Sequence, residues 1–157
     1  MRRKDREMPP EFAREVSDKC EYAALSMVDV NGGPYCVPVT IVRCGDSIYF
    51  HCAHEGLKIE CLKHDNRVCL ACVGDTKRAL DKFTTEFESA IIRGNAFEVT
   101  DEEEKISALR ALCERHTPTN MAAFDDAIQK SLSRTAIWRI DMTEITGKRK
   151  KYGAEKK

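Results

Sequence analysis

The segment from Tyr49 to Lys58, YFHCAHEGLK, combines residue types that suit phosphate binding. Its apolar first half predicts the end of a strand, and the residues from Glu55 onward predict a short amphipathic helix. The first backbone N–H groups of a helix lack partners within the helix, so they can bind an anion. Gly56 allows close approach, and Lys58 adds positive charge. We therefore predict a phosphate-sized anion site here, although Gly-x-Lys alone also describes a solvated helix lysine.

His51 lies in the alternating segment SIYFHC, which places Ile48, Phe50 and Cys52 on one face and His51 on the other. A histidine has an ordinary pKa near neutrality, which makes His51 the candidate catalytic residue for proton delivery. Cys52 is the one thiol directly beside a histidine, but a small buried filler is the favoured interpretation of that cysteine.

Eight cysteines raise the alternative of a thiol-based metal or redox sensor. The pair Cys69-x-x-Cys72 lies within two dozen residues of several histidines, as zinc sites often require. However, VCLACV predicts a strand, in which positions three apart face opposite ways. We predict no metal site and expect mostly buried, reduced thiols.

Bulk composition points to a small-molecule partner. Lys and Arg total 26 and so do Asp and Glu, so no net field favours nucleic acid or an anionic membrane. No apolar run reaches the roughly 20 residues needed to span a bilayer, and the segment MRRKDREMPP lacks the apolar stretch that a signal peptide requires, so we expect a cytoplasmic protein. The length of 157 residues predicts a single domain over 1–157, with a core over 8–148 and a basic tail over 149–157.

The pattern of elements predicts a mainly β fold, an antiparallel barrel with helical insertions. Pro38 cannot donate to a sheet and belongs at an edge or facing a ligand, and Gly94 with Asn95 predicts a bend in a long strand. The segment 75–82 reads as a polar linker, and the first helix as a flap. Strands are expected at 20–30, 35–43, 47–52, 68–73, 83–99 and 135–147, and helices at 8–19, 55–64, 101–115 and 120–132.

The order of motifs resembles a known family. GGPYCVPVTIV is followed by IYFHCAHEGLK, HDNRVCLACV, TTEFESAIIRGNAFEV and WRIDMTEITGK. This succession resembles the FMN-binding split barrels related to pyridoxamine 5′-phosphate oxidase, which are antiparallel barrels of Greek-key type. It is most similar to the flavin proteins of the nitroimidazole-resistance (Nim) type. The likeness covers residues 8–148.

The resemblance implies a homodimer with FMN at the subunit interface. One chain would supply residues along the ring edge, beside the ring and at the phosphate, and its partner would supply residues from the long strand and the C-terminal part. The first set is Pro38, Val39, Thr40, Phe50, His51, Gly56, Leu57 and Lys58, and the second is Glu88, Ser89, Trp138 and Lys148.

The implied function is electron transfer from a nicotinamide donor through FMN to a small acceptor, with a nitroaromatic compound as one candidate. This chain lacks the additional arginines of pyridoxamine phosphate oxidases, so we do not expect that activity. A flavin-binding or flavin-sensing module without turnover is the alternative within the same family.

Overall fold

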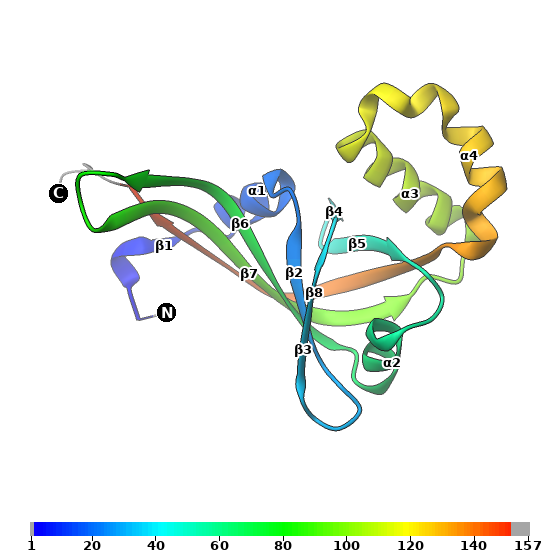
Figure 1. Ribbon diagram of the computed structural model, residues 1–157, viewed down its shortest axis with the longest axis horizontal. Helices are drawn as coiled ribbons and strands as arrows, with labels where there is room; N and C mark the ends of the chain where they lie inside the picture. Colours follow the sequence, from blue (N-terminus) through cyan, green and yellow to red (C-terminus); the bar gives the residue numbers. More distant parts are fainter. Residues whose placement is uncertain (1, 152–157) are drawn as a thin grey trace.

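The computed structural model describes residues 2–151 and is organised around one antiparallel sheet (Figure 1). The strand order is β3-β2-β6-β7-β8-β5-β4, with β1 added against β8, and every pairing is antiparallel. The terminal strands of this order, β3 and β4, are not paired with each other among the described residues, so the barrel is split. The strands are β1 (Glu7–Met8), β2 (Ala23–Val28), β3 (Pro34–Val39), β4 (Val42–Cys44), β5 (Ser47–Cys52), β6 (Arg67–Ala79), β7 (Thr84–Glu98) and β8 (Ala136–Lys150).

Four α-helices decorate the sheet, as predicted. They are α1 (Pro10–Lys19), α2 (Leu57–His64), α3 (Glu102–His116) and α4 (Phe124–Ser131). The expectation that the first helix is a flap is wrong, because α1 buries Phe12, Ala13 and Val16 in the main core. Gly147 of β8 permits this contact, since a Cβ there would lie 3.1 Å from the Cβ of Ala13. No helix among residues 2–151 is long and apolar enough to cross a membrane.

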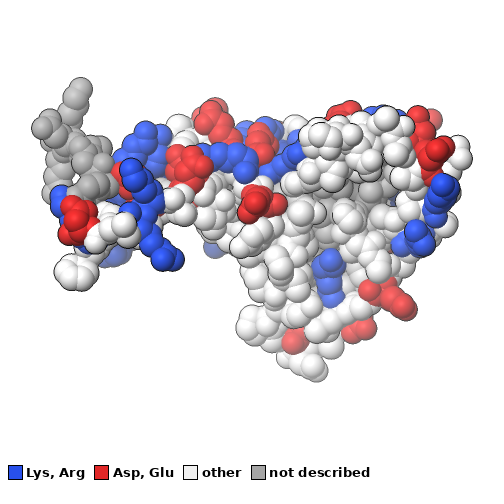
Figure 2. All heavy atoms as spheres, turned by 45° about the horizontal axis from the view of Figure 1, so that its top comes forward, with Lys and Arg blue, Asp and Glu red and all other residues white. Residues whose placement is uncertain are grey.

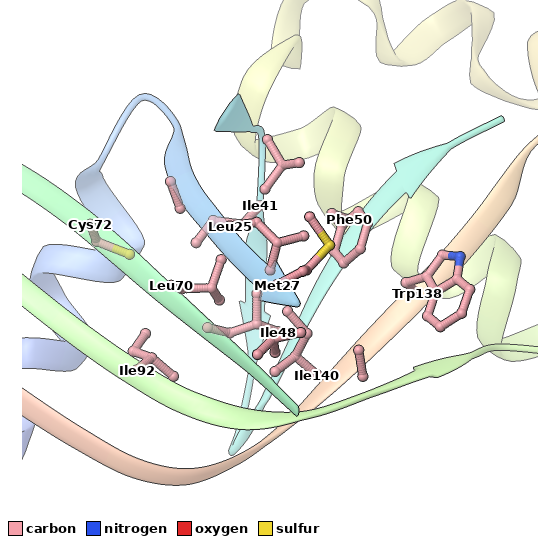
Figure 3. Packing of buried hydrophobic residues seen from close by; sticks show 14 of the residues in the cluster. Leu25, Met27, Ile41, Ile48, Phe50, Leu70, Cys72, Ile92, Trp138 and Ile140 are labelled. Carbon is pink, nitrogen blue, oxygen red and sulfur yellow. The ribbon is translucent and has the colours of Figure 1, made fainter. Parts of the chain in front are cut away.

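The core forms where inward-facing side chains of the curved sheet meet (Figure 3). On β5, Ile48 and Phe50 are fully buried while His51 is exposed, which confirms the predicted alternation. A second, smaller cluster lies under α3 and α4 and includes Leu109 and Phe124. Strand β5 therefore has one face in the main core and the other toward these helices.

Gly94 marks the predicted bend in the long strand. The pairing of β7 with β8 shifts register between Arg93 and Gly94. A Cβ at Gly94 would overlap the carbonyl oxygen of Asp141 and lie 2.9 Å from Cγ2 of Ile140. Only glycine lets the two backbones approach this closely.

Three strand boundaries differ from the sequence prediction. The single strand expected over 35–43 is interrupted at Thr40 and Ile41, which separate β3 from β4. The expected linker 75–82 is mostly strand, because β6 continues to Ala79 and pairs with the start of β7. These outer parts of β6 and β7, together with the end of β8, form an arm that projects beyond the core (Figure 1). The exposed side chains of the arm carry no apolar alternation that would signal a strand.

The last strand also runs further than predicted. Strand β8 continues past Gly147 to Lys150, where Arg149 and Lys150 pair with Glu88 and Phe87 of β7. The basic run is thus partly an element of the arm and not a solvated terminus. The rest of the predicted tail, residues 152–157, lies outside the described residues.

Candidate functional site

The junction between β5 and α2 has an open helix start. Gly56 adopts φ +114°, and its carbonyl accepts the first helical hydrogen bonds, from the N–H of Ile59 (2.9 Å) and of Glu60 (3.1 Å). The N–H groups of Leu57 and Lys58 precede these donors, and no side chain caps the helix. Two backbone donors are therefore available to a ligand.

Lys58 supplies an uncompensated positive charge at this helix start. Its Nζ lies 5.5 Å from the centroid of the Phe50 ring. Within the described part of the chain, its ammonium group forms no ion pair. Lys58 belongs to the first turn of α2, so the positive helix N-terminus and its side chain can act on the same anion.

His51 lies on the other face of β5 and is neutral at pH 7. Burial lowers the pKa of His51 below its ordinary value of 6.5, and charge repulsion from Lys58, and from His116 whenever that ring is protonated, lowers it further. The ring is exposed enough to reach solvent or a ligand. A neutral imidazole carries one donor and one acceptor nitrogen, so His51 can receive or deliver a proton.

A cavity of about 260 Å³ lies between β5 and the helices α3 and α4. Two predicted site residues, Thr40 and His51, share its wall. Its full lining is Thr40, His51, Leu109, Leu112, Cys113, His116, Thr117, Phe124, Ala127, Ile128, Ser131 and Thr135. Sequence reasoning missed the helical side of this cavity, because the spacing of Leu109 and Leu112 predicts a helix but not the strand that the helix covers.

The other residues predicted at the ring edge follow β3. Pro38 pairs with Ala24 on an edge strand and is exposed, as its missing N–H predicted. Val39 is 7% exposed and faces the core, so only its backbone is open to a ligand. Thr40 is exposed directly after the strand ends.

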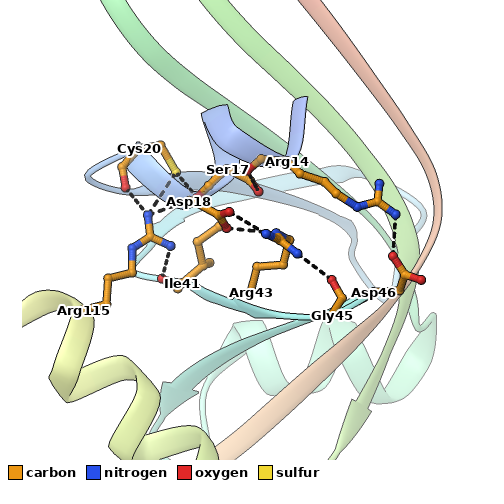
Figure 4. A network of polar contacts seen from close by, with 9 residues as sticks. All are labelled: Arg14, Ser17, Asp18, Cys20, Ile41, Arg43, Gly45, Asp46 and Arg115. Atoms are coloured by element: carbon orange, nitrogen blue, oxygen red, sulfur yellow. Dashed lines mark hydrogen bonds and ion pairs between the residues drawn. The ribbon is translucent and has the colours of Figure 1, made fainter. Parts of the chain in front are cut away.

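Two residues of α3, Arg115 and His116, hold the segment that contains Thr40, and Figure 4 shows the contacts of Arg115. Arg115 donates from Nη1 to the carbonyl of Ile41 (2.8 Å) and from Nη2 to the carbonyls of Cys20 (2.7 Å) and Ser17 (3.0 Å). The ring Nε2 of His116 lies 2.9 Å from the same Ile41 oxygen. The C-terminal end of α3 is thereby fixed to α1 and to the β3–β4 connection.

Glu88, Ser89 and Lys148 form a second group, on the arm. Ser89 and Lys148 are register partners, and Lys148 Nζ lies 5.6 Å from the centroid of the Phe87 ring. Glu88 forms an ion pair with Lys19. The arm and α2 lie in different parts of the molecule (Figure 1), so one chain does not bring the two groups together.

Trp138, which the resemblance implies as a partner-chain residue beside the flavin, lies apart from the arm. It pairs with Phe50 on β5 and is 3% exposed (Figure 3). Its Nε1 has no hydrogen-bond partner among the described residues. The ring therefore packs behind the face of the sheet from which His51 projects.

The cysteines do not converge on a metal site in the described residues. Cys72 of β6 is fully buried, whereas Cys69 faces the other side of the strand and is partly exposed. No group of three or more His, Cys, Asp or Glu side chains in residues 2–151 is placed to hold a metal ion.

Charge is distributed without a single-signed surface on the face shown in Figure 2. Basic and acidic side chains alternate along the arm and the upper edge, and much of the remaining face carries neither. This distribution agrees with the balance of 26 basic and 26 acidic residues.

Comparison with known proteins places the chain in a family. The family model described as pyridoxamine 5′-phosphate oxidase matches residues 18–149. The chain belongs to the pyridoxamine 5′-phosphate oxidase family. This membership confirms the resemblance seen in the order of the motifs. No curated protein matches the chain at a significant level.

Solved structures of this family's fold confirm the split barrel. A candidate 5-nitroimidazole antibiotic resistance protein from Bacteroides thetaiotaomicron is 26% identical, with a TM-score of 0.76 over 90% of this chain and 85% of that protein. The flavocytochrome Anf3 from Azotobacter vinelandii is 23% identical, with a TM-score of 0.76 over 90% of this chain and 67% of that one. An FAD- and haem-binding protein from Mycobacterium smegmatis is 18% identical, with a TM-score of 0.77 over 94% and 74%.

Proposed function

We propose that this member of the pyridoxamine 5′-phosphate oxidase family binds FMN and passes electrons from a nicotinamide donor to a small acceptor. The observation that carries the proposal is the open start of α2, where two free N–H groups and the Lys58 side chain, unpaired within the described structure, belong to the same first turn. Relatives of the same fold include an FAD-binding protein and a flavocytochrome, which supports a flavin as the ligand. The likeness to a candidate nitroimidazole resistance protein makes a nitroaromatic compound the first acceptor to test.

The residues at the junction fit a terminal phosphate. The N–H groups of Leu57 and Lys58 would donate to its oxygens, and Lys58 would balance part of its charge. A Cβ built at Gly56 meets nothing within 4 Å, so the approach to the helix start is open. FMN is proposed over FAD because its phosphate is terminal and presents three oxygens to this helix start.

The other residues that the resemblance assigns to the same chain would position the flavin ring system. The isoalloxazine would lie along Pro38, Val39 and Thr40, near Phe50 and His51. A bound flavin supplies hydride and electron transfer chemistry. His51 would then hold or deliver a proton at its ring nitrogen, since its lowered pKa keeps it neutral at pH 7.

A second chain would complete the site. Glu88, Ser89 and Lys148 lie on the arm, away from the α2 start of their own chain, so a homodimer is the arrangement that would bring them to a flavin (Figure 1). Sedimentation equilibrium is expected to give the mass of two chains. A monomer that binds FMN at full strength would rule out the two-chain site.

The function is tested by following NADH and NADPH oxidation with FMN-loaded protein and a nitroaromatic acceptor. We expect acceptor-dependent oxidation of one of the two donors and a loss of at least about tenfold in rate for His51→Gln, which removes the proton-transfer group. Tight FMN binding without turnover on either donor would support a flavin-binding module instead.

A further inference from the structure

We propose that the cavity between β5 and the helices α3 and α4 binds an uncharged, single-ring aromatic molecule that carries an O–H or N–H donor. For the small acceptor of the proposed flavin reaction this adds one requirement, an O–H or N–H group on its ring, and to that extent the assignment rests on the proposed function. The cavity itself is argued from its own lining, which includes Thr40 and His51 on the strand side.

The lining determines the charge of the ligand. None of the residues that line the cavity, all of them in the described part of the chain, is Lys, Arg, Asp or Glu. The neighbouring Arg115 is occupied by three backbone carbonyls. His51 is neutral at pH 7 because its pKa is lowered. A charged ligand would leave water without a counter-ion, which is costly in a partly buried site. Phosphorylated or carboxylated compounds are therefore disfavoured.

Hydroxyl groups in the lining are arranged to accept hydrogen bonds. Ser131 Oγ donates to the carbonyl of Ala127 (2.8 Å), Thr135 Oγ1 to the carbonyl of Ser131 (2.8 Å), and Thr117 Oγ1 to the carbonyl of Cys113 (3.2 Å). Each hydroxyl has a single proton, so these oxygens have only lone pairs left for a ligand. A ligand that meets them must itself donate.

His116 adds a further acceptor. Its Nε2 lies 2.9 Å from the Ile41 carbonyl oxygen, which can only accept, so Nε2 carries the proton. In the neutral ring the other nitrogen, Nδ1, is then an acceptor. The lining thus offers more acceptors than donors, and the remaining side-chain donors are the Thr40 hydroxyl, the N–H of His51 and the weak S–H of Cys113.

The size and the apolar half of the cavity indicate one aromatic ring. A volume of about 260 Å³ exceeds the roughly 150 Å³ of an engineered cavity that holds benzene, and it is too small for a dinucleotide. Leu109, Leu112, Phe124 and Ile128 provide an apolar surface for the ring. The combination of an apolar wall and several acceptors suits a phenol-like or aniline-like molecule.

Binding of phenol, toluene and benzoate to the purified protein tests the proposal. These probes differ in one group at similar size, and NMR shift titrations give their dissociation constants. We expect phenol to bind about threefold to tenfold more tightly than toluene, the gain of roughly one net hydrogen bond, and benzoate to bind most weakly. A cavity that only buries apolar area would bind toluene more tightly than phenol. Tighter binding of toluene, or tightest binding of benzoate, would overturn the proposal.

Two sets of variants locate the binding. Ala127→Phe fills the cavity and should abolish phenol binding, whereas Ala122→Phe, at an exposed alanine outside the lining, should not. Ser131→Ala and Thr135→Val remove acceptors, so they should weaken phenol and leave toluene within about twofold. Unchanged phenol affinity in Ala127→Phe would place the ligand elsewhere and overturn the assignment.

The outcome is separable from that of the proposed function. FMN content is read from the visible spectrum of the same samples, and phenol binding is read by NMR. Selective phenol binding in a protein that does not take up FMN would contradict the proposed function and support the cavity assignment. FMN binding without a preference for phenol over toluene would contradict the cavity assignment and leave the proposed function standing.

Discussion

A neutral His51 at pH 7 follows from what surrounds its ring. Partial burial disfavours the charged imidazolium, and the nearby Lys58 ammonium, together with His116 whenever that ring is protonated, disfavours it further. The folded-state pKa is lower than 6.5, so the unfolded chain binds more protons just below that value. His51 therefore contributes stability above pH 6.5 that is lost as the pH falls through its folded-state pKa.

An NMR titration of the His51 ring protons measures the pKa of His51 in the folded protein. The midpoint of His51, assigned by comparison with His51→Gln, is expected below 6.5. Lys58→Ala removes a nearby positive charge and should raise the midpoint, while Lys63→Ala, an exposed lysine near the end of the same helix, should not. A wild-type midpoint above 6.5 would contradict this account of the site.

Residue chemistry at the junction could be predicted, but the partners of those residues could not. The types and spacing of Gly56 and Lys58 alone predict the start of the helix. The proximity of His116 to His51 depends on where α3 folds back, and no local pattern encodes that placement. Trp138 illustrates the same limit, because strand register and not sequence position puts it beside Phe50.

At the scale of elements, the bend at Gly94 decides how β7 and β8 run together. Gly94→Ala is expected to cost about 2 kcal/mol or more of unfolding free energy, because the new methyl group meets the Asp141 carbonyl and Ile140. Gly45→Ala, in an open turn at φ +63°, should cost about 1 kcal/mol. Urea unfolding followed by Trp138 fluorescence measures both, and a smaller cost at Gly94 than at Gly45 would contradict the close approach.

Elements with one buried face were predicted well, and those without one were not. Strand β5 and helices α1 to α4 bury apolar residues at regular spacing, which their sequences display. The arm of β6 and β7 is held mainly by backbone pairing, and its tip exposes Leu80 and Phe83. Because side-chain patterning does not report backbone pairing, the segment 75–82 resembles a linker.

At the scale of the whole molecule, the predicted flavin residues fall into two groups. Thr40, His51 and Lys58 lie near the β5–α2 junction, while Ser89 and Lys148 lie on the arm (Figure 1). The split-barrel sheet is continuous between them, so a single chain cannot close the distance without breaking strand pairs. This separation is the physical reason for proposing that two chains build each site.

The central claim is that the start of α2 holds the phosphate of FMN, and an FMN titration tests it most directly. Quenching of flavin fluorescence gives the affinity of the wild type, of Lys58→Ala and of the matched control Lys63→Ala. We predict saturable FMN binding that Lys58→Ala weakens by about 10-fold to 100-fold, the loss of one charge-assisted contact, with Lys63→Ala within about twofold of the wild type. A wild type that ignores FMN, or a Lys58→Ala variant with undiminished affinity, would contradict the account.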